Sequence, residues 1–202
     1  YGYASKTFHA PLIAGMPGMT LAAVSSSDAA KVHADWPSVP VVSEPKHLFN
    51  DPNIDLIVIP TPNDTHFPLA KAALEAGKHV VVDKPFTVTL SQARELDALA
   101  KSLGRLLSVF HNRRWDSDFL TVKRLLSEGT LGEILFFESH FDRFRPQVRN
   151  RWREQAGPGS GIWYDLAPHL LDQAVNLFGL PVSMTVDLAQ LRPGAQTTDY
   201  FH

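Results

Sequence analysis

Near the end of the sequence, an apolar helical segment carries one narrow polar stripe, formed by Asp165, His169, Asp172 and Asn176. Spacings of four, three and four residues place the stripe on one face of a helix predicted at 162–178. An ordinary solvent-facing stripe has the same pattern, but a mostly buried helix would point it into a cleft. An Asp four residues before a His can orient the imidazole and raise its basicity, as a general base requires. The stripe therefore predicts proton-transfer chemistry at this helix.

A lysine follows a strongly apolar run at the place where a parallel strand would end. The run is Val80–Val82, and Asp83, Lys84 and Pro85 come directly after it. In open parallel sheets ligands bind beyond the carboxyl ends of the strands, and proline stops a strand and fixes the turn. A loop lysine that only faces solvent is the plain alternative. Lys84 is therefore a candidate for contact with a bound ligand.

Residues 1–5, Tyr-Gly-Tyr-Ala-Ser, could form the end of a glycine-rich turn between a strand and a helix. In such a turn the glycines let a pyrophosphate approach the helix N-terminus. The strand and the first glycine would then lie before residue 1. One glycine near a terminus is usually only a turn, so the motif by itself is a weak indication.

The composition is that of an ordinary folded protein, with 202 residues, 44% apolar and 20% charged. A formal net charge of −2 gives no overall attraction to nucleic acid or to an anionic membrane. The absence of cysteine excludes disulfides and thiolate metal sites, and the histidines lack metal-binding spacing. No apolar run approaches the roughly 20 residues of a membrane span. We expect a cytoplasmic protein with no metal, nucleic-acid or membrane partner.

Five arginines lie between residues 143 and 153, with Phe144 and Trp152 among them. Such a cluster could bind a nucleic-acid backbone, but Asp142 and Glu154 flank it and the net charge is negative. Binding of an anionic ligand, or an ion-pair network between subunits, is the favoured interpretation.

Apolar, β-branched runs alternate with helical patterns in the first part of the chain. Strands are predicted at 21–24, 39–42, 55–60, 79–83 and 106–110, and helices at 29–34, 45–50, 67–76 and 91–103, the last with Ser91 as its N-cap. This alternation predicts right-handed βαβ units and a parallel sheet. Beyond residue 116, helices are predicted at 117–128 and 162–178, and strands of an antiparallel sheet at 134–144 and 183–191.

These motifs together resemble the glucose–fructose oxidoreductase / inositol dehydrogenase (Gfo/Idh/MocA) family. Asp83-Lys84-Pro85 resembles the family's Glu-Lys-Pro motif, with Asp83 in place of the glutamate. The other matching segments, in chain order, are Gly2 with Ser5, 59–66 (Ile-Pro-Thr-Pro-Asn-Asp-Thr-His), 76–80 (Ala-Gly-Lys-His-Val), 110–115 (Phe-His-Asn-Arg-Arg-Trp), Gly129 with Gly132-Glu133, and 159–172 with Asp165, His169 and Asp172. They span nearly the whole chain. Within the family the chain is similar to enterobacterial oxidoreductases close to scyllo-inositol dehydrogenase.

The resemblance implies an α/β architecture in two domains. Residues 1–114 would be a Rossmann-type dinucleotide-binding domain lacking its first strand. Residues 115–202 would be the first part of a C-terminal α+β domain with a mostly antiparallel sheet, which makes the chain a fragment truncated at both ends. The family's assembly rule implies a homodimer or homotetramer that forms through this second sheet.

The resemblance also implies an NAD(P)-dependent dehydrogenase that acts on a secondary alcohol of a sugar, polyol or inositol. Lys84, Asp165 and His169 would be the catalytic set, in which Lys84 stabilises a developing alkoxide and His169 accepts the hydroxyl proton. Cofactor contacts would come from Gly2, Tyr3, Ala4, Ser5, Ser26, Ser27, Pro60, Thr61, Asn63, His66, Asp83, Lys84, Pro85, Asn112, Trp152 and Arg153. A same-fold lyase or hydrolase, or a nucleotide-sensing regulator, is the alternative, and the presence of Lys84 and His169 disfavours the regulator.

The residues after the second strand of the dinucleotide fold differ from the pattern of NAD-binding proteins. An Asp or Glu after the second strand normally binds the ribose hydroxyls and repels a 2′-phosphate. Here the strand is followed by Ser25, Ser26 and Ser27, with Lys31 one helical turn further on. The serines could instead cap the next helix, and Asp28 could restore the preference for NAD. We predict NADP rather than NAD.

Overall fold

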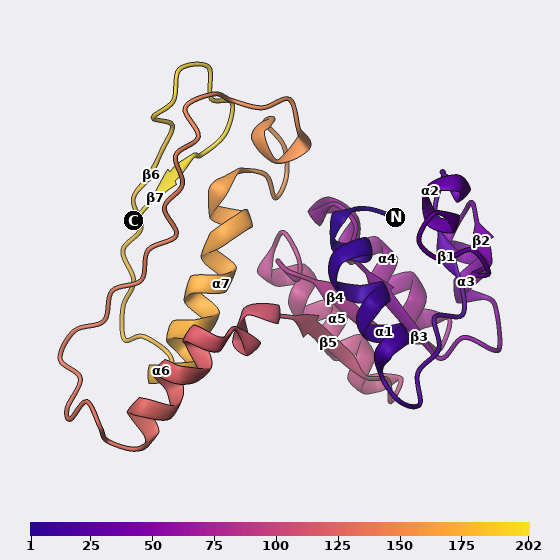
Figure 1. Cartoon of the computed structure of the whole chain (residues 1–202), viewed down its shortest axis with the longest axis horizontal. Helices are drawn as coiled ribbons and strands as arrows, with labels where there is room; N and C mark the ends of the chain where they lie inside the picture. Colours follow the sequence, from indigo (N-terminus) through magenta and orange to yellow (C-terminus); the bar gives the residue numbers. More distant parts are fainter. The chain divides into compact units, whose positions relative to one another are not determined.

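The computed structural model describes all 202 residues and divides them into two compact units, residues 1–110 and 111–202 (Figure 1). The boundary follows Phe110, a few residues before the predicted one. None of the helices combines the length and the apolar character that a membrane span needs.

The first unit alternates helices with short strands. In chain order it contains a π-helical turn η1 (Ser5–His9), α1 (Ala10–Gly15), β1 (Val24–Ser25), α2 (Ala29–His33), β2 (Val41–Val42), α3 (Pro45–Phe49), β3 (Leu56–Ile59), α4 (Asn63–Glu75), β4 (His79–Asp83), α5 (Leu90–Ser102) and β5 (Leu107–Phe110). This is the α/β, Rossmann-type architecture that the sequence predicts.

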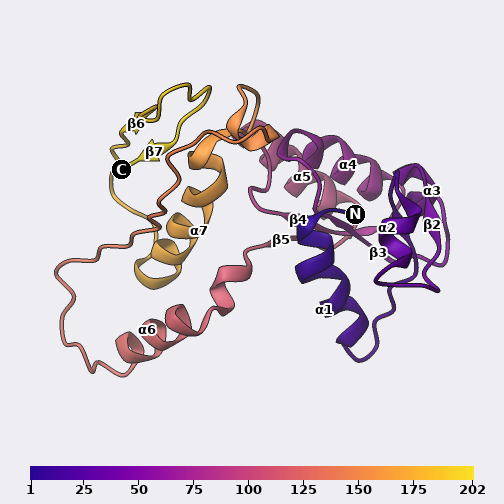
Figure 2. The same cartoon turned by 45° about the horizontal axis from the view of Figure 1, so that its top comes forward.

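Strands β3, β4 and β5 form a parallel sheet in that order. Their apolar, β-branched residues favour strands that are buried on both faces. Helices α4 and α5 lie side by side and pack with the sheet (Figure 2), where Val82, Leu74 and Leu96 have no exposed surface. Burial of each of the two leucines stabilises the fold by roughly 1.5–3 kcal/mol. This core fixes the carboxyl ends of β3 and β4.

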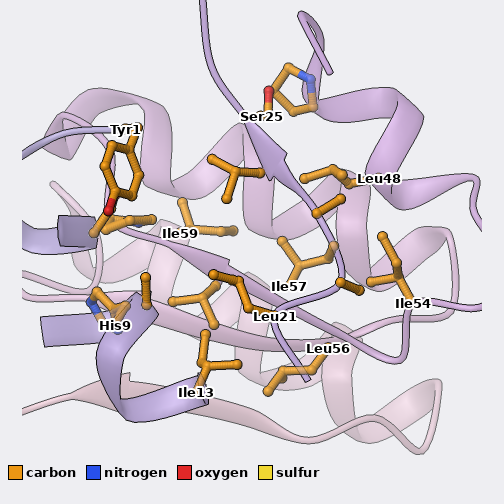
Figure 3. Close-up of a pocket in the computed structure, with 18 of the residues that line it drawn as sticks. Tyr1, His9, Ile13, Leu21, Ser25, Leu48, Ile54, Leu56, Ile57 and Ile59 are labelled. Atoms are coloured by element: carbon orange, nitrogen blue, oxygen red, sulfur yellow. The ribbon is translucent and has the colours of Figure 1, made fainter. Parts of the chain in front are cut away.

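Strands β1 and β2 form a separate parallel pair, and β1 is not hydrogen-bonded to β3. A hollow of about 660 Å³ lies between the two sheets, with Leu21, Ile57 and Ile59 among its apolar lining (Figure 3). A parallel strand in this hollow would join the two sheets into one.

Two helix starts in the first unit differ from the prediction. Helix α4 begins at Asn63 instead of Phe67, because its first turn is polar and apolar periodicity does not reveal it. Helix α5 begins at Leu90, and its N-cap is Thr89 and not Ser91. The Thr89 hydroxyl accepts the Gln92 N–H while the Gln92 side chain accepts the Thr89 N–H, which makes a capping box.

The second unit is built around one long helix. It contains the 3₁₀ turns η2 (Asn112–Trp115) and η3 (Trp152–Glu154), helices α6 (Ser117–Ser127) and α7 (Gly161–Phe178), and an antiparallel pair formed by β6 (Leu188–Ala189) and β7 (Tyr200–Phe201). The strand predicted at 134–144 is wrong for this structure, and the one predicted at 183–191 shrinks to β6. Alternation gives a segment two unlike faces, but a strand also needs a neighbouring strand to take up its hydrogen bonds.

Gly161, the first residue of α7, has a φ of +89° and is in tight contact with the segment before β7. A Cβ atom there would lie 2.5 Å from Thr198 Oγ1 and 2.6 Å from Thr197 Oγ1. Both distances are shorter than any normal van der Waals contact, so the neighbouring atoms would have to move. We expect Gly161→Ala to lower the free energy of unfolding by about 1–3 kcal/mol, through strain and overpacking. The matched control is Gly157→Ala, at a glycine with open space around it, which should change it by less than about 0.5 kcal/mol. Denaturant unfolding of both variants measures the difference, and equal midpoints would contradict the expectation.

Candidate active-site residues

The lysine turn lies at the carboxyl end of β4. Asp83 is the last residue of the strand, and its Oδ1 accepts the backbone N–H of Lys84 at 2.8 Å. Burial raises the pKa of the Asp83 carboxyl, but the His9 ring, the Lys84 N–H and the Lys84 charge outweigh burial and hold the pKa below its usual range. The carboxylate thus stays ionised and anchors the lysine backbone, while the Lys84 side chain is only partly buried. The Lys84–Pro85 peptide is cis.

His66 on α4 contacts the same turn through the carbonyl oxygen of Pro85. Its ring is fully buried, with Nδ1 2.8 Å from the Pro85 carbonyl oxygen and Nε2 2.9 Å from the Thr61 carbonyl oxygen. The ring therefore links the turn after β4 to the turn after β3. The ring has no exposed surface, and its contact with a cofactor stays a prediction. The neighbouring Asn63 is 5% exposed.

Four predicted cofactor residues gather at the hollow between the sheets. Gly2 and Ser5 line it from the first helix, and Pro60 and Thr61 line it from the end of β3. Figure 3 shows Ser25, Ile59 and Tyr1 around this part of the hollow. Tyr3 is 77% exposed and does not line it.

The chain is helical from residue 3 to residue 15, and Lys6 N–H bonds back to the Gly2 carbonyl oxygen at 3.0 Å. The first turn of any helix leaves N–H groups without intrahelical acceptors, and such groups bind phosphate oxygens well. Gly2 has open space around the position that a Cβ would take, so a ligand can approach its backbone. These residues fit the pyrophosphate of a dinucleotide.

The serines after β1 are arranged around the start of α2. Asp28 is the N-cap, and its Oδ1 accepts the Lys31 N–H at 3.0 Å. The Ser26 hydroxyl is 3.1 Å from both the N–H and the carbonyl oxygen of Asp28. Asp28 and not a serine therefore caps the helix. Ser27 is exposed, and of the three serines only Ser25 lines the hollow.

In the second unit, predicted site residues lie on and near α7. Asp165 and His169 are one turn apart, and His169 is 7% exposed. Asp165 Oδ1 lies 3.4 Å from Nε of Arg153, whose guanidinium stacks over the Trp152 ring at 4.4 Å. The structure thus brings together four predicted residues of this unit. A carboxylate and an imidazole thus lie one turn apart on α7, and the Arg153 guanidinium of η3 lies beside the carboxylate.

Asp172 has a different role from the rest of the polar stripe. It receives two hydrogen bonds from the Arg114 guanidinium, at 2.5 and 2.8 Å, and His111 Nδ1 lies 3.8 Å away. A two-pronged Arg–carboxylate pair is strong and directional. Asp172 therefore ties α7 to η2, where the predicted residue Asn112 lies.

The arginine cluster is partly paired within the chain. Buried Glu154 accepts hydrogen bonds from the Arg151 guanidinium at 2.7 Å and from the Arg149 N–H at 3.0 Å, and it lies 3.2 Å from Arg192. Burial raises the pKa of Glu154, but these three partners outweigh it and hold the pKa below its usual range. Arg192 also bonds Asp199 at 2.8 Å, so the network joins η3 to the loop before β7.

Sequence reasoning missed one buried polar residue near the lysine turn. His9 in η1 lies with its Nε2 4.0 Å from Asp83 Oδ2. The available signal was a histidine seven residues after Gly2 on the same helical pattern.

Comparison with known proteins decides the family. The family description "Oxidoreductase family, NAD-binding Rossmann fold" matches residues 1–111, and "GFO/IDH/MocA C-terminal domain" matches residues 119–202. The chain belongs to the Gfo/Idh/MocA oxidoreductase family. This confirms the family and the fold class that the sequence predicts.

Two curated Gfo/Idh/MocA relatives match over the whole chain. YdgJ of Escherichia coli (strain K12), described as an uncharacterized oxidoreductase, is 89% identical over 202 residues, which are 58% of its own length. IolW of Bacillus subtilis (strain 168), a scyllo-inositol 2-dehydrogenase (NADP(+)), is 42% identical over 56% of its length. The solved structure of YPO2259 from Yersinia pestis superimposes with a TM-score of 0.94 at 74% identity, over all of this chain and 57% of that one. The chain thus spans a little over half the length of these relatives.

Proposed function

We propose that the protein is an NADP-preferring dehydrogenase that oxidises a secondary alcohol of a sugar, polyol or inositol. The observation that carries the proposal is Lys84, anchored through Asp83 at the carboxyl end of β4 in a domain of the NAD-binding Rossmann family. That edge of a parallel sheet is where dinucleotides and their substrates bind. The relative IolW, whose name gives an inositol substrate and NADP(+), supports the substrate class.

Four side chains divide the chemistry in this proposal. The bound nicotinamide supplies the acceptor for the hydride that leaves the carbinol carbon. His169 takes the proton of the substrate hydroxyl, so that the oxygen retains the electron pair that forms the carbonyl. The Lys84 ammonium stabilises negative charge on that oxygen as the proton leaves. Asp165 orients the substrate or His169, and Arg153 holds the Asp165 carboxylate in place.

A screen of the full-length protein tests this function. Polyols, inositols and aldoses are added one by one with NADP or NAD while the absorbance of reduced nicotinamide is followed. We expect at least one compound to give sustained release of reduced cofactor. A lyase would form product without this release, and a regulator would bind the cofactor and turn over none of the panel. Either result would contradict the proposal.

The preference for NADP rests on the missing acid after β1. The serines carry hydroxyls and no charge, and the Asp28 carboxylate beside them is engaged as the N-cap of α2. We expect wild-type kcat/KM to favour NADP, and Ser26→Asp to shift the ratio towards NAD by about tenfold or more, since juxtaposed like charges cost several kcal/mol. Ser38→Asp adds the same charge at an exposed site and should leave the ratio unchanged. A wild-type preference for NAD, or no shift in Ser26→Asp, would refute this assignment.

We propose further that the full-length protein is a homodimer or homotetramer. The segment around Phe136 and Phe137 supports this, because these side chains are 79% and 40% exposed, which is a large aromatic surface to leave in water. Light scattering at micromolar concentration measures the assembly, and a monomer under those conditions would contradict it.

A further inference from the structure

His9 is a buried histidine that the proposed chemistry does not use. It exposes 6% of its surface, and its ring lies against Phe110 with the two ring centroids 4.3 Å apart. It belongs to the same unbroken helix, residues 3–15, whose first turn lines the hollow with Gly2 and Ser5. The His9 ring and the residues that line the hollow therefore belong to one continuous stretch of chain.

The Nε2 atom of His9 faces the lysine turn. It lies 4.0 Å from Asp83 Oδ2, and no acceptor is within hydrogen-bond distance of it. That separation is longer than a hydrogen bond but short enough for electrostatic attraction. If Nε2 carries the proton, this buried N–H has no acceptor, and a small closing movement towards the carboxylate would give it one.

The Asp83 carboxylate has one oxygen for each neighbour. Its Oδ1 accepts the Lys84 N–H at 2.8 Å, and its Oδ2 faces His9. The carboxylate is 19% exposed, so few water molecules compete for it. One side chain thus bridges the first helix and the backbone of the lysine.

We propose that His9 is a positioning residue for Lys84. The imidazole fixes the Asp83 carboxylate, and the carboxylate fixes the lysine backbone, so that the helix that would seat the cofactor phosphates also sets the place of the lysine. The catalytic role of Lys84 in this inference rests on the proposed function. His9 itself touches neither substrate nor cofactor. His66 supports the turn on its other side, through the Pro85 carbonyl.

Kinetics of the full-length protein test the inference. His9→Phe keeps a ring against Phe110 but removes the Nε2 donor, whereas His9→Gln keeps an amide donor. Because a misplacement of about 1 Å can cost a factor of order 10², we expect His9→Phe to lower kcat by about tenfold or more. The KM for the cofactor should change by less than about threefold, and His9→Gln should recover most of the lost kcat. The control His47→Phe, at an exposed histidine on α3, should behave as wild type.

Hydrogen exchange of the Lys84 amide gives a second readout that needs no activity. We expect faster exchange of this amide in His9→Phe, with near-normal exchange in His9→Gln and unchanged exchange at Val81 in both variants. Unchanged kcat and Lys84 exchange in His9→Phe would overturn the inference, as would equal losses in both variants with faster exchange along all of β4. A wild-type protein without dehydrogenase activity, in which His9→Phe still accelerates Lys84 exchange, would refute the proposed function and leave the positioning role standing.

Discussion

We expect Lys84→Met to lower the turnover number of the full-length protein by about 10²-fold or more, which is the scale for loss of a positioned electrostatic group. Methionine retains the unbranched apolar stem, so the change removes little besides the ammonium. The Asp83 anchor is to the backbone N–H of residue 84, which the substitution also retains. The expected defect is therefore in kcat, with the free energy of unfolding near that of the wild type. Steady-state kinetics with the best substrate of the panel measure it.

Lys101→Met is the matched control for this variant. Lys101 is exposed on α5 and pairs with Asp97 four residues earlier, an ion pair worth no more than about 0.5 kcal/mol. The control should turn over like the wild type. Near-normal turnover in Lys84→Met would remove the lysine from the catalytic set.

His169→Ala has an effect of similar size, because general-base catalysis contributes typically 10²–10⁴-fold. The proposed function requires the neutral imidazole as base, so we expect the wild-type rate to fall at acidic pH. Without the imidazole the acid limb of the pH–rate profile flattens. Turnover measured across the pH range tests both the size and the shape of the effect.

His47→Ala, at the exposed histidine on α3, should retain the wild-type rate and profile. A normal acid limb in His169→Ala would assign the proton transfer to another group, even if the rate falls.

The parallel strands could be predicted from the sequence because burial on both faces makes them continuously apolar. The bounds of β3, β4 and β5 agree with the predicted runs to within about one residue. The segment 134–144 shows that an alternating pattern does not by itself predict a strand. Its alternation of aromatic and polar residues is real, but pairing between strands is a property of two segments, and none in this chain pairs with it.

The candidate site shows the same limit at the level of single residues. Helical spacing correctly put Asp165 and His169 on one face of α7, but it could not show that Asp172 is bound by Arg114, which lies 58 positions away in sequence. The contacts of His9 and His66 could not be predicted for the same reason. Their partners are a carboxylate and two backbone carbonyls that only the folded chain brings near.

Transfer of deuterium from substrate to cofactor is the most direct test of hydride transfer. The full-length protein is incubated with NADP and an active polyol that carries deuterium on its carbinol carbon, and the reduced cofactor is isolated. The proposed function predicts one deuterium atom at C4 of the nicotinamide for each molecule of carbonyl product, and loss of this transfer in step with turnover in Lys84→Met. Carbonyl product without deuterium in a released, reduced cofactor would contradict it.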